Sequence, residues 1–109
     1  MKRGDIVVMV APGDLGKPRP AIIVQADELR ADVTSFLVCP MSSEVQTLHY
    51  ARPVFEPSVG NGLRVRSQVM VDKLLPLRRE RIRRTIGHIS ETERDHLDRA
   101  LLIVLGLAR

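Results

Sequence analysis

The residue of strongest chemical character in this sequence is Arg19, which stands between two prolines in the stretch Lys17-Pro18-Arg19-Pro20. Each proline fixes its own φ angle, and Pro20 also restricts Arg19 to extended backbone. A guanidinium is thereby held rigidly at the start of an apolar run, where its planar fork can grip a phosphate. The alternative is that Arg19 pairs with a carboxylate such as Asp14 and that the prolines only end a loop.

Two neighbouring hydroxyls, Ser42 and Ser43, follow the apolar run 34–39. A hydroxyl at the end of a strand can hold a phosphate oxygen by a hydrogen bond. A serine pair is also common turn chemistry, in which the hydroxyls bond only to the local backbone. The spacing of the two serines leaves both interpretations open.

The remaining reactive side chains argue against metal or disulfide chemistry. Cys39 is the single cysteine, so the chain has neither an internal disulfide framework nor the ligands of a Cys/His zinc cluster. We expect no metal and no cofactor. His49 falls in an irregular segment and could support a site, whereas structural roles are favoured for His88, among core residues, and for His96, among helix-surface charges.

Composition places the chain among ordinary globular proteins with a basic surface. Hydrophobic residues make up 44% and charged residues 28%, and 17 Lys and Arg against 13 Asp and Glu give a formal charge of +4. This excess, mostly arginine, favours a polyanionic partner. The sequence shows no signal-peptide core and no apolar stretch long enough for a bilayer, which predicts a cytoplasmic protein with no membrane partner.

Short β-branched runs and turn residues predict a mainly β protein with one helix. The predicted strands are 5–10, 20–25, 34–39, a weaker edge strand at 51–56, a long strand at 63–73 and a short one at 84–89. The first three carry apolar residues on both faces, so we expect the sheet to be covered on both sides. Residues 74–84 are interpreted as a connector that includes one helical turn, and its arginine-rich stretch 78–84 as a solvated, partly helical segment rather than an RNA clamp.

The predicted strand 63–73 has one apolar and one charged face. Strand alternation places five side chains on the charged face: Arg64, Arg66, Gln68, Met70 and Asp72. A strand of this kind lies at a surface, and that surface is basic. We therefore take Arg64 and Arg66 as better nucleic-acid contacts than the arginines of 78–84.

A closing helix is predicted over 91–105. Ser90 and Glu93 form a capping box at its start, and Gly106 marks its end. Its predicted inner stripe is Leu97, Leu101, Val104 and Leu105. Leu102 and Ile103 widen the apolar surface, which favours a dimer contact. Close-spaced strands followed by one helix predict a single domain over 1–109, a small antiparallel β-barrel or curled sheet with a C-terminal helix.

Five stretches, in this order and spacing, resemble the MazF/PemK family of toxins. They are residues 3–7 (RGDIV), 16–24 (GKPRPAIIV), 40–43 (PMSS), 67–74 (SQVMVDKL) and 86–90 (IGHIS). The resemblance covers nearly the whole chain. It implies an SH3-like barrel with a C-terminal α-helix, a homodimer, a cognate antitoxin as partner, and metal-independent, sequence-specific cleavage of single-stranded RNA, including mRNA, to 2′,3′-cyclic phosphate and 5′-hydroxyl ends.

The resemblance also assigns site residues. The essential arginine of the family falls on Arg19, and its usual threonine falls on Ser42, which retains the hydroxyl. In the Kid branch an arginine and an aspartate also act; the aspartate position matches Asp72, whereas Met70 stands at the arginine position. We expect Arg19 and Ser42 to be catalytic and the following to support them: Ser43, His49 and Asp72. The expected RNA contacts are Lys17, Arg64, Arg66 and Gln68.

Two other functions are compatible with the same fold. A CcdB-type gyrase poison depends on a tryptophan near the C-terminus, and this chain contains no tryptophan. A catalytically silent barrel that binds RNA or a protein is the second, and retention of Arg19 with the Ser42 hydroxyl argues against it.

Overall fold

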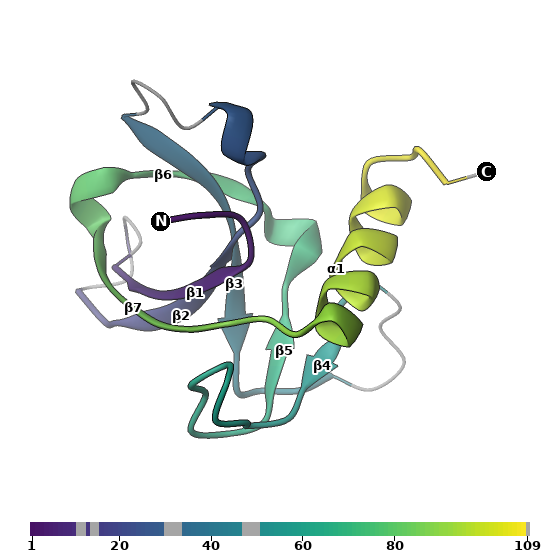
Figure 1. The fold of residues 1–109 in the computed structure, drawn as a ribbon, viewed down its shortest axis with the longest axis horizontal. Helices are drawn as coiled ribbons and strands as arrows, with labels where there is room; N and C mark the ends of the chain where they lie inside the picture. Colours follow the sequence, from purple (N-terminus) through teal and green to yellow (C-terminus); the bar gives the residue numbers. More distant parts are fainter. Residues whose placement is uncertain (11–12, 14–15, 30–33, 47–50, 109) are drawn as a thin grey trace.

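The computed structural model describes residues 1–10, 13, 16–29, 34–46 and 51–108. Within these residues one curled, antiparallel, seven-stranded sheet carries a single α-helix on one side (Figure 1). The strands are β1 (Asp5–Met9), β2 (Arg19–Ile23), β3 (Ser35–Ser42), β4 (Val54–Phe55), β5 (Ser67–Val69), β6 (Leu75–Arg78) and β7 (Ile82–His88). Their order is β4-β5-β3-β2-β1-β7, with β6 paired to β3. The predicted mainly β fold with a C-terminal helix is confirmed.

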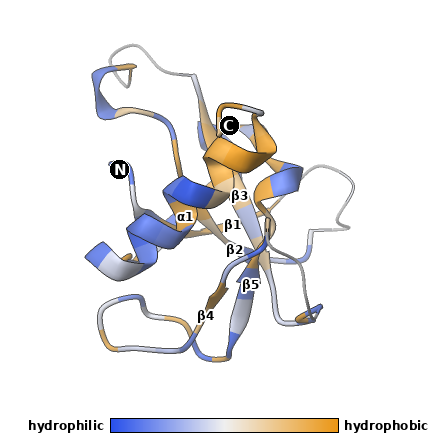
Figure 2. Ribbon diagram, turned by 90° about the vertical axis from the view of Figure 1, so that its right-hand side faces the viewer, coloured by the Kyte–Doolittle hydropathy of each residue, from blue (hydrophilic) through white to orange (hydrophobic). Residues whose placement is uncertain are grey.

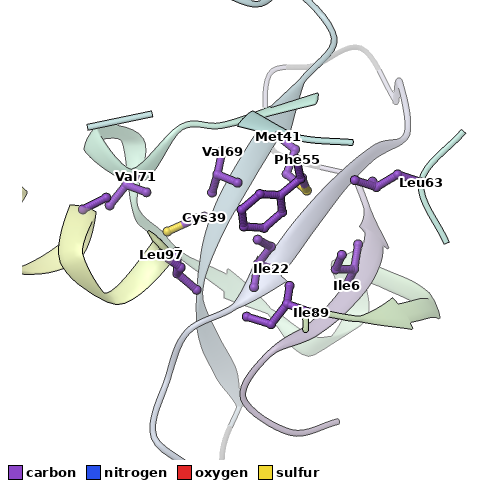
Figure 3. Packing of buried hydrophobic residues seen from close by; sticks show 11 residues of the cluster. Ile6, Ile22, Cys39, Met41, Phe55, Leu63, Val69, Val71, Ile89 and Leu97 are labelled. Carbon is purple, nitrogen blue, oxygen red and sulfur yellow. The ribbon is translucent and has the colours of Figure 1, made fainter. Parts of the chain in front are cut away.

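The apolar residues of the central strands divide between the two faces of the sheet, as alternation requires. Ile6 pairs with Ile22, which pairs with Cys39, and all three are buried in a cluster that reaches Leu97 of the helix (Figure 3). The residues next to them in β1 and β2 bury into a second cluster that is closed by β6. The expectation that both faces are covered is therefore confirmed.

The predicted long strand at 63–73 is wrong. Only β5, three residues long, is a strand there, and a 3-10 turn, η2 (Val71–Lys73), follows it. The longest strand is β3 instead, with eight residues. β5 pairs with β3 on one edge and β4 on the other, and all three of its residues are buried. Alternation does not carry into the flanking residues: Gln68 is fully buried, whereas Val65 is 55% exposed.

The connector predicted at 74–84 contains a strand that the sequence analysis missed. β6 pairs with the first half of β3, with Pro76 opposite Leu37. Among the described strands β6 has no other neighbour, so the missing amide of the proline is tolerated. One 3-10 turn, η3 (Arg79–Arg81), then leads into β7, which starts two residues before the predicted strand.

The helix α1 spans Glu91–Val104 and begins as predicted. The Ser90 hydroxyl accepts from the Glu93 amide at 3.1 Å, and the Glu93 carboxylate accepts from the Ser90 amide at 2.8 Å. Gly106, at a φ of +71°, ends the helix. Leu97 and Ala100 are buried, whereas Leu105 is 54% exposed, so its place on the inner stripe is wrong.

The last turn of α1 and the residues after it are apolar and exposed (Figure 2). The exposed large side chains there are Leu102, Ile103, Leu105 and Leu107. In the part of the chain that the structure describes, no helix has the length and apolar character needed to cross a bilayer.

Candidate active site

Arg19 is the first residue of β2, where it pairs with Met9 of β1. Pro18 is exposed and Pro20 is half-buried on either side of it. The Arg19 side chain is partly covered, and its Nε atom is buried. Arg19 is thus the residue at which the strand starts, as the flanking prolines predict. Asp14, the alternative ion-pair partner, lies outside the described residues.

The register of the sheet brings Ser42 to the same end of the molecule as Arg19. Ala21 of β2 is opposite Pro40 of β3, and Arg19 and Ser42 each lie two residues beyond this pair, toward the same end of the two antiparallel strands. Ser42 is half-buried and Ser43 is exposed. The Ser42 hydroxyl accepts from the Glu44 amide at 3.1 Å, which is the local turn bond. Accepting that bond does not use its O–H, which can still donate to a phosphate oxygen.

Arg19 also lines a cavity of about 360 Å³ between β1, β2, β7 and residues 62–67. Arg64 and Arg84 line the same cavity, so it brings together three arginines from three separate segments. The apolar part of the lining consists of Val8, Pro18, Pro20, Leu63, Val65 and Ile86. Arg84 was not singled out from the sequence, because it stood as one of five arginines in 78–84.

Asp72 lies in η2, which packs against α1, and it is not among the residues that line this cavity. Its carboxylate accepts from Arg52 Nε at 2.8 Å and from Arg52 NH2 at 3.0 Å. This hydrogen-bonded ion pair raises the pKa of Arg52 above its usual value. Arg52 was not predicted from the sequence, because nothing in the spacing of residues 52 and 72 indicates that they meet.

The expected RNA contacts are divided by the structure. Lys17 is exposed beside Arg19, and Arg64 lines the cavity. Arg66 is exposed and pairs with Glu56 at 3.0 Å. The common face expected for Arg64, Arg66 and Asp72 does not exist, because residues 63–66 are not in a strand.

Gln68 takes part in local structure in this conformation. Its amide donates to the Gln46 carbonyl at 2.9 Å and accepts from the Gln46 amide at 3.4 Å. These two bonds hold the chain that follows Ser42 and Ser43 against β5. His49, the other expected supporting residue, lies outside the described residues.

The two histidines expected to be structural lie away from the cavity lining. His88 Nδ1 is 2.8 Å from Asp5 Oδ1 and links the end of β7 to the start of β1, while His96 is exposed on α1. Two arginines of 78–84 have defined surroundings rather than plain solvent: Arg84 lines the cavity, and the Arg79 guanidinium lies 5.4 Å from the ring centre of Phe36. Among the described residues, no three His, Cys, Asp or Glu side chains are grouped to hold a metal ion.

Comparison with known proteins agrees with this fold. A "Probable endoribonuclease MazF" from Mycolicibacterium smegmatis is 37% identical over 109 residues, 99% of both chains. "Endoribonuclease MazF9" from Mycobacterium tuberculosis is 29% identical over 116 residues, 98% of both chains.

Solved structures share the architecture at low identity. The M. tuberculosis toxin MazF-mt6 superposes with a TM-score of 0.80 at 22% identity, over 94% of this chain and 96% of that one. A mycobacterial endoribonuclease in complex with its cognate antitoxin superposes with a TM-score of 0.84 at 17% identity, over 100% and 98%. The model of the PemK-like, MazF-like toxins of type II toxin-antitoxin systems matches residues 2–105. The predicted resemblance is confirmed: this chain belongs to the PemK-like, MazF-like family of type II toxins.

Proposed function

We propose that this chain is the toxin endoribonuclease of a toxin-antitoxin pair and that it cleaves single-stranded RNA, mRNA included, beside Arg19 and Ser42. Loss of intact mRNA would then stop translation and growth. The observation that carries the proposal is the position of Arg19, held between two prolines where β2 starts, at the same end of the sheet as Ser42 and at the edge of a cavity with two further arginines. A polyanion with a reactive phosphodiester fits these groups.

The site residues suit cleavage by the RNA's own 2′-oxygen. In that reaction the 2′-oxygen forms a bond to the adjacent phosphorus and the bond from phosphorus to the 5′-oxygen breaks. The 2′-hydroxyl loses its proton and the leaving oxygen gains one, giving a 2′,3′-cyclic phosphate and a 5′-hydroxyl. Arg19 would stabilise the added negative charge on the phosphorane, which for a positioned donor is worth about 3 to 4 kcal/mol.

Ser42 would orient the scissile phosphate by donating its O–H. Ser43, exposed next to it, and Asp72 are supporting candidates, as is His49. Because Asp72 is bound to Arg52 and does not line the cavity, we assign it a positioning role, in which it fixes the end of β5.

The test is cleavage of single-stranded RNA oligonucleotides by the purified protein in EDTA. Arg19→Ala should lower the rate by roughly a hundredfold to a thousandfold with an unchanged circular dichroism spectrum. Ser42→Ala should have a smaller effect, since one neutral hydrogen bond contributes less than a charge. Arg99→Ala, on the exposed side of α1, is the matched control. A requirement for magnesium, or full activity without Arg19, would contradict the proposal.

We propose two protein partners, a second copy of this chain and a cognate antitoxin, with the complex in the cytoplasm. The apolar strip formed by Leu102, Ile103, Leu105 and Leu107 supports the homodimer, since monomers seldom leave such a surface uncovered. Light scattering should give twice the 12.2 kDa chain mass, and Leu102→Glu should shift it toward the monomer. A short, acidic, partly disordered chain encoded next to this one should copurify with it and block cleavage.

A further inference from the structure

The base of the cavity beside Arg19 is a row of side chains across three neighbouring strands. Val8 of β1 is opposite Pro20 of β2 on one side and Arg84 of β7 on the other. Directly opposite residues project from the same face of a sheet, so these three side chains stand together. Arg84 is therefore fixed at one end of an apolar row, and the start of β2, with Arg19, is at the other end.

The facing wall is built by residues 60–67, which are pinned to β7. A Cβ atom at Gly87 would lie 2.3 Å from the Asn61 backbone, and one at Gly62, where φ is +70°, would lie 2.0 Å from the Ile86 carbonyl oxygen. Only glycine permits either approach. The His88 amide also donates to the Gly60 carbonyl at 2.9 Å. The wall that carries Arg64 and Val65 is thus held firmly against the strand that carries Arg84.

The lining combines apolar surface with arginine side chains, which donate hydrogen bonds and accept none. Its charged side chains are three arginines, and a guanidinium has five N–H donors and no acceptor. Its one hydroxyl side chain, Ser67, already donates to the Val65 carbonyl at 2.9 Å. A bare phosphate would satisfy the arginines but would leave the apolar lining without a partner. A flat ring with acceptors along one edge satisfies both.

We propose that this cavity receives one unstacked nucleobase of the RNA and that Arg84 reads its acceptor edge. The volume of about 360 Å³ is at the small end of the range for ligand sites, roughly 300 to 1,000 Å³. Guanine is the preferred base, because its O6 and N7 are adjacent acceptors that match the guanidinium fork. Arg64 closes the cavity over the neighbouring phosphate. This inference rests on the proposed function, since it names a base-selecting subsite for the same RNA.

The experiment measures binding of short RNAs that cannot be cleaved, so that it does not depend on catalysis. Fluorescence anisotropy would measure the affinity of the protein for three 2′-O-methyl cytidine hexamers. One cytosine is replaced by guanine in the first, by 7-deazaguanine in the second and by adenine in the third. The protein should bind the guanine hexamer roughly tenfold to a hundredfold more tightly than the other two, because 7-deazaguanine lacks N7 and adenine presents a donor in place of O6.

Three variants separate base reading from simple charge. Arg84→Ala should abolish the preference among the three hexamers. Arg84→Lys should restore the overall affinity but not the preference, because lysine keeps the charge and loses the fork. Arg83→Ala is the matched control, since Arg83 is an exposed neighbour on β7 that is not among the residues lining the cavity, and it should keep the preference.

Equal binding of the three hexamers by the unmodified protein would overturn the inference. An Arg84→Ala variant that keeps the preference for guanine, or an Arg84→Lys variant that shows the same preference as the unmodified protein, would also overturn it. Cleavage of RNA with free 2′-hydroxyl groups by the same protein preparation reports on the proposed function separately. A protein that prefers guanine but does not cleave would leave the subsite standing and remove the nuclease assignment.

Discussion

Arg52 and Asp72 form a two-pronged ion pair, in which both nitrogens on one edge of the guanidinium donate to the carboxylate, at 2.8 and 3.0 Å. The Arg52 side chain is only 10% exposed, while that of Asp72 is 34% exposed. Arg52 lies two residues before β4, and Asp72 lies in η2 after β5. The pair therefore ties the edge strand to the turn that packs on α1. It also gives Asp72 an arginine partner, although Met70 stands at the position where the Kid branch has its arginine.

Arg52→Ala and Asp72→Asn should each destabilise the fold, and the double variant should lose less than the sum of the two. For a partly exposed pair the coupling free energy should be about 0.5 to 1 kcal/mol, measured by urea unfolding of all four proteins. In single-turnover cleavage at saturating RNA, we expect each variant to stay within about tenfold of the parent, well short of the loss from Arg19→Ala. A loss from Asp72→Asn as large as that from Arg19→Ala would make Asp72 a catalytic residue.

Replacing the ribose on the 5′ side of the cut by deoxyribose should leave the oligonucleotide whole. The substitution removes the proposed nucleophile but retains the phosphates and bases that the arginines would contact. The substituted oligonucleotide should bind with unchanged affinity and inhibit cleavage of the all-ribose strand competitively. Denaturing gels with both strands provide the readout. Cleavage of the substituted strand at the same bond would assign the attack to water or to a protein side chain.

Asn61 should be one of the least replaceable polar residues in the described chain. It is fully buried, and its side chain makes four hydrogen bonds at 2.9 to 3.0 Å, with the Ser58 and Leu63 amides, the Glu56 carbonyl and the Glu93 carboxylate. Asn61→Asp keeps the shape of the side chain. It replaces the Nδ2 donor, which faces the Glu56 carbonyl and the Glu93 carboxylate, by an oxygen that can only accept. We expect a loss of at least about 2 kcal/mol, and a thermal midpoint lower by roughly 10 °C.

Ser58→Ala is the control for Asn61, because it removes only the bond from the Asn61 amide to the Ser58 hydroxyl. Its cost should be about 1 kcal/mol. Equal midpoints for Asn61→Asp and the parent would mean that the loop does not depend on this side chain. Since the loop carries Arg64, we also expect Asn61→Asp to weaken the guanine preference in step with the loss of stability.

Cys39 should be inert toward thiol reagents while the protein is folded. Burial raises the pKa of its thiol to about 12, with the Asp72 carboxylate adding to the rise and Arg3 opposing it. At pH 8 the folded thiol should react with a disulfide reagent only as fast as the protein opens, and at once in denaturant. The folded state favours the neutral thiol, so its contribution to stability is complete below about pH 9 and is lost as the pH rises toward 12. Rapid modification at pH 8 without denaturant would contradict this.

The parts of the fold that depend on local chemistry were predictable from sequence. The capping box of Ser90 and Glu93 is written in four consecutive residues, and it placed the start of α1 correctly. The prolines around Arg19 act on the neighbouring backbone alone, and they indicated that the strand β2 starts there. The apolar runs likewise indicated the first three strands.

The parts that failed depend on contacts between distant residues. The alternating pattern of 63–73 is that of a surface strand, but Asn61 and two glycines dock residues 60–67 onto β7 and leave only Ser67–Val69 to pair. Arg84 enters the candidate site because Val8 is opposite it, and a strand register is not visible in the composition of an arginine run. Arg52 and Asp72 meet although 20 residues separate them, and the local sequence around either residue does not indicate this contact.

Glu93 divides its carboxylate between two duties: one oxygen accepts from the Ser90 amide at the start of α1, and the other accepts from Asn61, which anchors the loop that faces β7. Fraying of the first helical turn and opening of the loop therefore break bonds to the same side chain. The amide hydrogens of Glu93 in the helix and of Leu63 in the loop should exchange with solvent as one cooperative unit, with a shared opening free energy, although 30 residues separate them in sequence. The stability of the wall of the candidate RNA cavity therefore depends on the cap of the helix α1.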